Sequence, residues 1–559
     1  MKLKGAEIIV ESLKKEKVEV VFGYPGSAVI PVFHYLFDAP FKFILPRHEQ
    51  GGIHGADGYA RASGKPGVVI ATSGPGATNL VTGIATANMD SIPLVVITGQ
   101  VARNMIGNDA FQEVDIVGVT RPIVKHSYLV QDIKDLARII KEAFHIAATG
   151  RPGPVLIDIP VDISNETCEF EYPEEVSIRG YKPSYEGNTK QIKLAAKEIA
   201  KAKRPVIYAG GGVISSNSAD ELAAFAKKTR IPVTTTLLGL GGFPETDELS
   251  LKMLGMYGTY YANQAIDKAD LIIAVGARFD DRVTGKIDSF SPSSKVIHID
   301  IDPSSVSKNI AVDIPIVGDC KPILKELTKE VTPPDIGEWL GILAELKKKY
   351  PFSYKNSENV IKPQFVVEEI YRQTKGDAII CTEVGQNQLW AAQFYEFTKP
   401  RTFISSGGFG TMGYGFPAAI GAQLARPDKR VIDIAGDGSI QMNIQELIVA
   451  AQHKLPVIIA ILNNGFLGMV RQWQQMFWDK RYSYTCIDFA PDFVKLAEAY
   501  SAVGIKITEK KDVAPAIKRA LSITDKPIVL DFRVEREENV FPFVPAGKSI
   551  DETIMGEKE

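Results

Sequence analysis

The sequence alternates short runs of β-branched residues, many of them ending at glycine, with segments of helical periodicity along its whole length. This pattern is typical of parallel α/β sheets, whose buried strands are almost continuously apolar. We expect strands at VEVVFG, FKFIL, GVVIATSG, PLVVITG and PVLIDIP in the first third of the chain, at PVIYAGGGV, IPVTTT, DLIIAVGAR and KVIHIDID in the second, and at AIICTEVG, RVIDIAGDG, VIIAILNNG and PIVLDFRV in the last. The predicted fold class is therefore α/β, with three doubly wound parallel-sheet domains.

Two breaks in this alternation predict the domain boundaries. The polar, acidic stretch SNETCEFEYPEEVSIRGYKPSYEGN places one boundary near residue 185. The lysine-rich helical stretch WLGILAELKKKYPFSYKNSEN places the second near residue 350. Since 559 residues are too many for a single core, we expect domains at 1–185, 186–350 and 351–559.

Charge and cysteine content narrow the functional classes. The chain carries 64 basic and 67 acidic side chains, so nothing indicates a partner such as nucleic acid. Its four cysteines are scattered and form no CxxC pair, which favours a reduced compartment. No apolar run approaches the length of a membrane span, and the N-terminus lacks a signal-peptide core. We expect a cytoplasmic or organelle-matrix enzyme with no membrane partner.

The stretch VIDIAGDGSIQMNIQELIVAAQHKLPVIIAILNNG is the most informative motif. It reads as a strand, a GDG turn, an amphipathic helix, a second strand and an Asn-Asn-Gly turn. The separation allows one right-handed crossover between adjacent parallel strands, which would bring Asp437 and Asn464 together at the carboxyl ends. A carboxylate and a carboxamide oxygen suit Mg²⁺, while Gly436 and Gly438 let main-chain N–H groups approach a diphosphate. Each turn alone has a purely structural interpretation, but both at this spacing favour a site.

A second glycine pattern is a decoy. GFGTMG, which spans Gly408–Gly413, matches the GxGxxG motif of dinucleotide-binding folds, and Asp433 follows twenty residues later. However, Asp433 is expected inside the next strand, with no exposed strand-end position. We therefore set the dinucleotide interpretation aside.

An acid stands where one strand is expected to pass into a helix. In FILPRHEQGGIHGADGYAR, Glu49 follows an apolar run and precedes two glycines and a helical stretch. Ligands bind at this position in open α/β sheets. The alternative interpretation is a solvated acid that the helix dipole stabilises. A zinc protease is excluded, because the histidines of HEQGGIH are six residues apart and a helical zinc pair needs four.

The GDG turn followed by Asn-Asn resembles the signature of thiamine-diphosphate-dependent enzymes. This resemblance implies thiamine diphosphate and Mg²⁺ as cofactors, with Asp437, Asn464 and the main-chain carbonyl of Phe466 as metal ligands. It implies that Glu49 meets the aminopyrimidine ring from another domain, with sites shared between subunits, so that a dimer is the minimum active unit. Met412 is implied as the side chain beneath the cofactor; alternatively, it is a core methionine that fills a gap. Further cofactor-binding positions are Val384, Gly385, Gln386, Asn387, Gly410, Gly436, Gly438, Ser439 and Gly465.

Six further motifs narrow the resemblance, and they cover essentially the whole chain. GYPGSAVIPV, RHEQGGIHGADGYARASGKPGV, SGPGATN, DAFQEVD, GARFDDRVTG and GFLGMVRQWQ occur in this order. Together they resemble the acetohydroxyacid synthase (acetolactate synthase) catalytic subunit. That family decarboxylates pyruvate and joins the two-carbon unit to a second pyruvate or to 2-ketobutyrate, in branched-chain amino-acid biosynthesis.

The same resemblance assigns side chains around the reacting carbon. Gly26, Phe111 and Gln112 match active-site positions, and Met469 and Trp473 match the pocket for the second 2-ketoacid. Trp473 is otherwise an ordinary core or interface aromatic residue. Three positions depart from the family: Ser27 replaces a usual glycine, Val161 replaces a common lysine, and Asn387 stands where histidine is frequent.

The middle third carries AGGGVI, TTTLLGLG, LGMYG and VGARFDDR. Without the family these indicate only a glycine-rich α/β domain with a cluster of arginine and aspartate. The resemblance implies an FAD site, with a structural flavin because the reaction has no net redox change. The implied positions are Arg151, Gly211, Gly212, Thr236, Leu237, Met256, Arg278, Asp280, Arg282, Asp300 and Asp319.

Other functions stay open at this point. Pyruvate oxidase also uses FAD and thiamine diphosphate, although MVRQWQ argues against it, and glyoxylate carboligase lacks the glutamate that Glu49 supplies. A non-catalytic nucleotide-binding homologue would not need Glu49, Met412, Asp437 and Asn464 together. The family resemblance also implies a homodimer or homotetramer with a separate small regulatory subunit. The C-terminal stretch NVFPFVPAGKSIDETIMGEKE resembles the family's lid.

Overall fold

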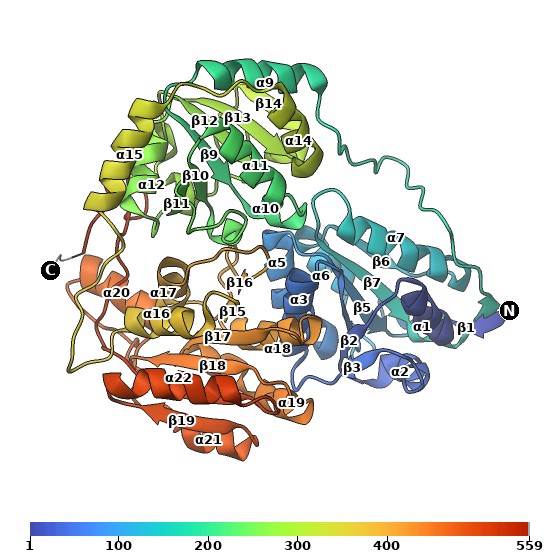
Figure 1. Ribbon diagram of the computed structural model, residues 1–559. Helices are drawn as coiled ribbons and strands as arrows, with labels where there is room; N and C mark the ends of the chain where they lie inside the picture. Colours follow the sequence, from blue (N-terminus) through green and yellow to red (C-terminus); the bar gives the residue numbers. More distant parts are fainter. Residues whose placement is uncertain (557–559) are drawn as a thin grey trace.

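The computed structural model describes residues 1–556, which fold around three six-stranded sheets (Figure 1). Every strand pair within these sheets is parallel. A short antiparallel pair, β1 (Lys2–Lys4) with β8 (Thr167–Glu169), stands apart from them. The prediction of three doubly wound α/β units is confirmed. No helix within residues 1–556 combines the length and apolarity that crossing a membrane requires.

The N-terminal sheet has the strand order β3-β2-β4-β5-β7-β6. Its interior strands are buried along their whole length, as expected for a sheet covered on both faces. The strands are β2 (Val20–Gly23), β3 (Lys42–Ile44), β4 (Gly67–Ala71), β5 (Leu94–Gln100), β6 (His126–Leu129) and β7 (Pro154–Pro160). The helices are α1 (Gly5–Lys15), α2 (Ile30–Leu36), α3 (Glu49–Ser63), α4 (Pro75–Thr78), α5 (Val81–Asp90), α6 (Ile116–Thr120), α7 (Leu136–Ala148) and α8 (Val161–Asn165).

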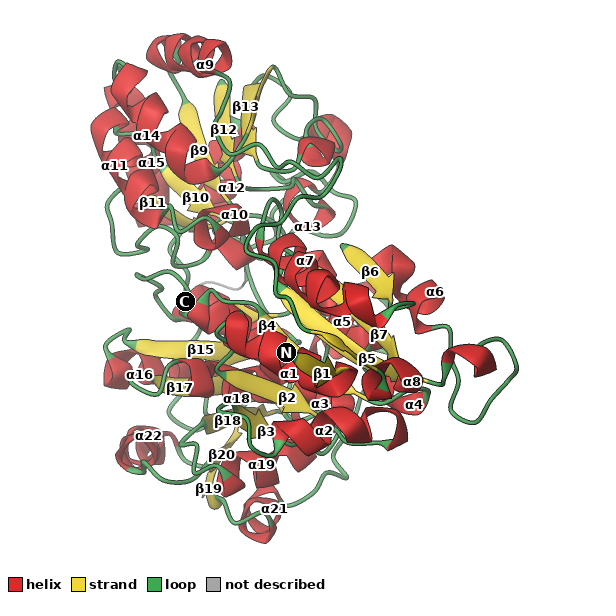
Figure 2. Cartoon of the chain, turned by 90° about the vertical axis from the view of Figure 1, so that its right-hand side faces the viewer, coloured by secondary structure: helices red, strands yellow, loops and turns green. Residues whose placement is uncertain are grey.

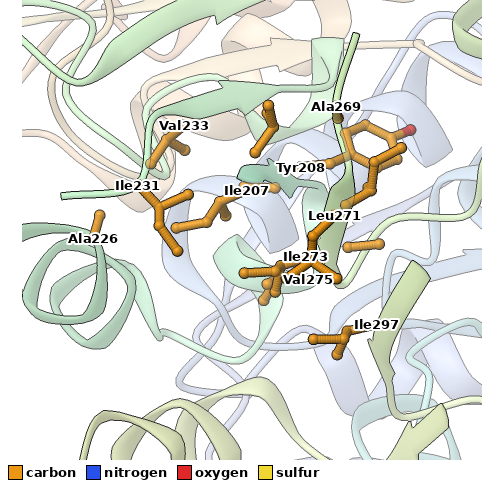
Figure 3. Packing of buried hydrophobic residues seen from close by; sticks show 14 of the residues in the cluster. Ile207, Tyr208, Ala226, Ile231, Val233, Ala269, Leu271, Ile273, Val275 and Ile297 are labelled. Carbon is orange, nitrogen blue, oxygen red and sulfur yellow. The ribbon is translucent and has the colours of Figure 1, made fainter. Parts of the chain in front are cut away.

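The middle sheet has the order β11-β10-β9-β12-β13-β14. Ile207, Ile273, Val275 and Ile297 from three adjacent strands pack into its core (Figure 3). The strands are β9 (Pro205–Ala209), β10 (Val233–Thr235), β11 (Ser250–Met253), β12 (Leu271–Val275), β13 (Lys295–Asp300) and β14 (Ile314–Val317). The helices are α9 (Thr189–Lys201), α10 (Gly211–Ser215), α11 (Ala219–Thr229), α12 (Tyr260–Asp267), α13 (Asp281–Thr284), α14 (Cys320–Glu330) and α15 (Gly337–Lys349).

The C-terminal sheet has the order β16-β15-β17-β18-β20-β19. The crossover from β17 to β18 is the one that the GDG motif predicts, with Gly436 opposite Leu462. The strands are β15 (Ala378–Thr382), β16 (Phe403–Ser405), β17 (Arg430–Gly436), β18 (Ile458–Asn463), β19 (Val503–Ile507) and β20 (Ile528–Arg533). The helices are α16 (Pro363–Thr374), α17 (Gln386–Phe394), α18 (Gly415–Ala425), α19 (Leu447–Gln452), α20 (Gly468–Phe477), α21 (Phe493–Ala499) and α22 (Val513–Ser522).

Helices α3 and α18 join the N-terminal and C-terminal units, and they lie side by side in Figures 1 and 2. Their backbones approach so closely that side chains would collide. A Cβ on Gly58 would lie 2.0 Å from the carbonyl oxygen of Ala418, and one on Gly421 would lie 1.8 Å from that of Gly55. One continuous apolar cluster, which includes Ile53 and Ile420, runs through both units. The two sheets are therefore held as one body around this crossing.

In each of the three sheets, the chain first adds strands on one side of the sheet's first strand and then continues on the other side. The reversal falls between β2 and β4, between β9 and β12, and between β15 and β17. Ligands of open α/β sheets bind outside the carboxyl ends of the strands at this point. The topology therefore offers three crevices, one in each unit.

Candidate active site

Asp437 and Asn464 follow the neighbouring strands β17 and β18. The N–H of Gly465 donates to Oδ2 of Asp437 at 3.1 Å. The other oxygen, Oδ1, is buried without a hydrogen-bond partner. Burial raises the pKa of Asp437 to about 7. A buried, unpartnered carboxylate oxygen costs free energy, which a bound cation would offset.

The remaining oxygens at this strand end suit a hard cation. Oδ1 of Asn464 accepts from the N–H of Phe466 at 3.1 Å, and the Asn464 amide donates to Oε1 of Gln386 at 3.3 Å. Within residues 1–556 no group of three or more His, Cys, Asp or Glu side chains could hold a metal ion. A set of one carboxylate, one carboxamide and a main-chain carbonyl fits Mg²⁺ that phosphate oxygens and water complete.

The segment after β15 lies against β17 and contacts Asn464. Gly385 has φ 152°, and α17 begins at Gln386. The Asn387 amide donates to the carbonyl oxygens of Glu383 and Ile434, at 3.0 and 2.8 Å. A Cβ on Gly385 would lie 2.8 Å from Oδ1 of Asn387. Asn387 therefore ties the loop that begins at Val384 to β17.

The glycines of the GDG turn have separate surroundings. A Cβ on Gly438 would lie 2.7 Å from Cδ2 of Leu467, whereas one on Gly436 would lie 3.2 Å from Oδ1 of Asn387. Ser439 begins a short 3₁₀ turn, Ser439–Met442. A larger residue at 438 would therefore displace the Leu467 side chain, a contact that the sequence does not reveal.

The Gly407–Gly413 segment carries Met412 and is held at both ends. Asp90 accepts from the N–H groups of Gly407 and Gly408, at 3.1 and 2.8 Å. Glu383 accepts from the N–H of Gly413 at 2.7 Å. Between these ties Gly410 has φ 70° and Met412 is half-buried. The backbone on both sides of Met412 is therefore held by buried carboxylates.

Glu49 is the first residue of α3, at the carboxyl side of the N-terminal sheet. The Asn79 amide donates to its Oε2 at 2.9 Å. A Cβ on Gly76 would lie 3.4 Å from the other oxygen. Asn79 and Gly76 both belong to the SGPGATN motif, and they orient a half-buried carboxylate.

Gly26, Ser27 and Gln112 gather beside the crevice between β2 and β4. A Cβ on Gly26 would lie 2.5 Å from Cβ of Thr72, and the Ser27 hydroxyl donates to Oε1 of Gln112 at 3.4 Å. Gln112 has φ 59°, and Phe111 beside it is 86% exposed. Thr72 also lies close to Gly76, which in turn lies beside Glu49, so Gly26 and Glu49 belong to neighbouring parts of the N-terminal unit.

Met469 and Trp473 lie on α20 and meet the middle unit. The Tyr257 hydroxyl lies 3.1 Å from Sδ of Met469, and the Trp473 indole N–H lies 3.5 Å from that hydroxyl. The Phe543 ring lies 5.2 Å from Tyr257 and 6.2 Å from Trp473. Three distant segments therefore meet in one aromatic cluster. Phe543 belongs to the predicted lid, whose residues 557–559 lie outside the described part.

In the middle unit the crevice between β9 and β12 is lined by glycine backbone. The N–H of Gly212 donates to the carbonyl oxygen of Gly276 at 3.0 Å, and Gly276 has φ 57°. A Cβ on Gly212 would lie 2.5 Å from Cα of Gly276. The close contact of these two turns therefore requires glycine, and Gly211 begins α10 beside them.

Several polar residues predicted for the middle site have local partners. Thr236 caps a 3₁₀ turn that begins at Leu237, Asp280 caps α13 and Asp319 caps α14. Asp300 accepts from the N–H of Asp302 at 2.8 Å. These contacts are compatible with a structural role for each of them.

The arginines of this region make few charged contacts. The Arg278 and Arg282 guanidinium groups contact the sulfurs of Met89 and Met256, at 4.0 and 3.8 Å. Arg151, from the N-terminal unit, pairs with Asp302 at 3.2 Å. A phosphate could therefore bind the guanidinium groups of Arg278 and Arg282.

Asp433 cannot serve a dinucleotide. It lies within β17, is fully buried, and neither of its carboxylate oxygens has a hydrogen-bond partner. Burial raises its pKa well above the ordinary value, and the nearby Glu383 carboxylate adds to this. The acid that would complete the GxGxxG pattern is therefore not exposed to a ligand.

Matches to three protein-family models define the class of protein. The family model of the N-terminal thiamine pyrophosphate binding domain matches residues 3–119, that of the thiamine pyrophosphate enzyme central domain matches 192–327, and that of the C-terminal binding domain matches 383–532. The fold and the three crevices thus belong to a thiamine pyrophosphate enzyme.

Full-length relatives give the particular family. The chain is 48% identical to the acetolactate synthase large subunit of Haemophilus influenzae, over 100% of this chain and 99% of that protein. It is 49% identical to that of Corynebacterium glutamicum, over 98% and 89%, and 46% identical to the isozyme 3 large subunit of Escherichia coli, over 100% and 99%. The chain belongs to the acetolactate synthase large-subunit family, as its motifs indicate.

Proposed function

We propose that the chain catalyses acetolactate synthesis. Two pyruvate molecules give 2-acetolactate and CO2, and 2-ketobutyrate as the second substrate gives 2-aceto-2-hydroxybutyrate. The observation that carries this proposal is the orphaned Oδ1 of Asp437 beside Asn464, in a chain that also presents Glu49 from an acetolactate-synthase-like N-terminal unit.

The two thiamine pyrophosphate binding domains supply complementary residues. When bound, the cofactor would supply a ring carbon that becomes a nucleophile toward a ketoacid carbonyl after it loses its proton, and a cationic ring that takes up the electron pair released when CO2 leaves. Asp437, Asn464 and the carbonyl of Phe466 would hold Mg²⁺ and through it the diphosphate. Glu49, oriented by Asn79, would accept a hydrogen bond from the aminopyrimidine ring and so govern the proton at that end.

A dimer follows as part of this proposal. Glu49 is hydrogen-bonded to Asn79 within the N-terminal unit, and Asp437 is hydrogen-bonded to Gly465 within the C-terminal unit. We propose that each site combines Glu49 of one subunit with Asp437 of the other, in a homodimer or homotetramer. The exposed Phe111 ring would then be covered by the partner subunit.

The second 2-ketoacid would occupy the pocket of Met469, Trp473, Tyr257 and Phe543. Its rings exclude water from the carbon–carbon bond-forming step. A pocket built this way distinguishes a methyl from an ethyl group by only about 1–3 kcal/mol. Gly26, Phe111 and Gln112 would line the side nearer the reacting carbon.

FAD is proposed for the crevice of the middle unit. The glycine-lined turn after β9 and the arginines Arg278 and Arg282 fit a diphosphate-bearing ligand. Because acetolactate synthesis has no net redox change, the flavin would be structural. We further propose a small regulatory subunit, which the relatives' designation as large subunits suggests, a cytoplasmic location, and domain boundaries near 185 and 350.

The test is an incubation with pyruvate, in which Mg²⁺, thiamine diphosphate and FAD are omitted one at a time. The product is acidified and measured as acetoin. Acetolactate that requires the cofactors supports the proposal. Acetyl phosphate or peroxide would instead indicate a pyruvate oxidase, and unchanged pyruvate would contradict both.

A further inference from the structure

Glu446 of the C-terminal unit reaches across to the residues that precede Glu49. It ends the 3₁₀ turn Ile444–Glu446 and is 2% exposed. Its Oε1 accepts from the N–H of Arg47 at 2.9 Å and from that of His48 at 3.1 Å. Its Oε2 lies 3.1 Å from the same Arg47 nitrogen. One carboxylate therefore binds both main-chain donors just before α3.

A glycine in α3, Gly51, makes room for the contact with Glu446. A Cβ on Gly51 would lie 2.6 Å from Oε1 of Glu446 and 2.8 Å from its carboxyl carbon. Glycine at this helical position thus makes room for the incoming side chain. Glycine otherwise weakens a helix interior relative to alanine, so its presence here has a steric reason.

The Arg47 side chain does not explain the buried acid. Its guanidinium donates instead to the carbonyl oxygen of Leu45 at 2.7 Å and to Oε1 of Gln452 at 3.1 Å. The hydrogen bonds to Glu446 thus come from main chain rather than from a charged side chain. A buried carboxylate is costly, and burial raises the pKa of Glu446 to about 7. The main-chain N–H groups at the start of α3 donate to both carboxylate oxygens of Glu446 and so offset this cost. A neutral amide has one acceptor oxygen and would keep only part of these hydrogen bonds.

We propose that Glu446 is a positioning residue for Glu49. By fixing the main chain at Arg47 and His48, it sets where α3 begins and hence where the Glu49 carboxylate points. This inference rests on the proposed function, in which Glu49 meets the aminopyrimidine ring. Without the hydrogen bonds from Arg47 and His48 to Glu446, the Glu49 carboxylate would stay near the site but lose its alignment. A misplacement of about 1 Å can reduce a rate by about 100-fold.

The experiment compares four variants of the full-length protein. Glu446→Gln leaves a single acceptor oxygen and places an amide NH2 group, itself a donor, against the main-chain N–H groups of Arg47 and His48. Gly51→Ala pushes the Glu446 side chain away while it favours the helix, so it keeps the test decisive if Glu446→Gln folds poorly. Gln452→Ala is the matched control, because it removes a contact to the Arg47 side chain and leaves the main-chain ties intact. Glu49→Gln is the reference for loss of the carboxylate itself.

Four quantities are measured for each variant. They are kcat for acetolactate formation, the dissociation constants of thiamine diphosphate and of pyrophosphate with Mg²⁺, and hydrogen–deuterium exchange of residues 43–53. Pyrophosphate with Mg²⁺ reports only on the end of the site that contains Asp437. We expect Glu446→Gln and Gly51→Ala to lower kcat about 10- to 100-fold. They should also weaken thiamine diphosphate binding and speed exchange at 47–50, with pyrophosphate affinity unchanged. Gln452→Ala should match the unaltered protein.

The outcomes separate this inference from the proposed function. If Glu49→Gln lowers kcat but Glu446→Gln and Gly51→Ala do not, the positioning role of Glu446 is wrong. If pyrophosphate affinity falls together with kcat, Glu446 supports the fold at large, and the specific role is again wrong. If Glu49→Gln itself retains activity, the proposed role of Glu49 fails, and the inference falls with it.

Discussion

The main-chain N–H of Gly465 donates to one carboxylate oxygen of Asp437 at 3.1 Å, while the other oxygen is buried without a partner. The two residues follow adjacent parallel strands, so the crossover itself creates this half-satisfied acid. A buried acid in this state is suited to bind a cation, because the cation supplies the partner that the second carboxylate oxygen lacks.

Asp437→Asn should weaken binding of pyrophosphate with Mg²⁺ by at least about tenfold, since a neutral amide balances less of the cation's charge. Isothermal titration calorimetry measures the affinity. Asp488→Asn is a matched control, because Asp488 lies beside Gly465 but forms an exposed pair with Arg536. Equal affinities for all three proteins would exclude Asp437 as a metal ligand.

Trp473→Leu should change the ratio of 2-aceto-2-hydroxybutyrate to 2-acetolactate when pyruvate and 2-ketobutyrate compete. The indole contacts the Tyr257 hydroxyl and stands near the Phe543 ring, so its removal would open space beside the proposed position of the second ketoacid. We expect a change of about 10- to 200-fold at most. Trp478→Leu, at a residue 67% exposed, serves as the control. An unchanged ratio would place the specificity pocket elsewhere.

Gly212→Ala should release flavin, because the added Cβ would meet Cα of Gly276 at 2.5 Å and move the turn after β9. Fluorescence of the flavin retained after gel filtration measures the loss. Gly337→Ala adds the same methyl group where no atom lies within 4 Å. Full flavin retention by Gly212→Ala would argue against a site in this crevice.

Glu245→Gln should stabilise the protein increasingly as the pH rises from 5 to 8. Burial raises the pKa of Glu245 to about 7, so the folded state binds a proton that the unfolded state releases near its ordinary pKa of 4.5. The contribution of the native carboxyl group is thus full below about 4.5 and is lost as pH rises through about 7. The amide keeps an acceptor for the N–H of Phe397 without taking up a charge. Melting curves of both proteins across this range give the difference, and a difference independent of pH would contradict the assignment.

The sequence predicted the interior of each sheet better than its edges. Most of the expected strands are interior strands, such as β5 and β17, which are buried almost throughout; FKFIL is an exception, because it forms the edge strand β3. β6, β11, β14 and β19 were not expected, and each of them lies at the edge of its sheet. Edge strands such as HSYL and VGIKI are only partly buried, so their polar and glycine residues break the apolar pattern.

The candidate site shows the same division between local and distant information. Asp437 and Asn464 are predictable because one crossover fixes their proximity. Tyr257 and Phe543 were missed, since their meeting with Trp473 depends on how three separate segments pack. Glu446 lies within the quoted NIQEL stretch, but its partner segment is about 400 residues away in sequence, and no periodicity records such a contact.

Glu49 of the N-terminal unit and Asp437 of the C-terminal unit are proposed to serve one carboligation. The most direct measurement is the initial rate of acetolactate formation by Glu49→Gln at saturating pyruvate, Mg²⁺, thiamine diphosphate and FAD, beside the unaltered protein. Our account predicts a fall of about 100-fold or more, with the melting temperature preserved, because a positioned acid–base group contributes about that much. A rate equal to that of the unaltered protein would contradict it.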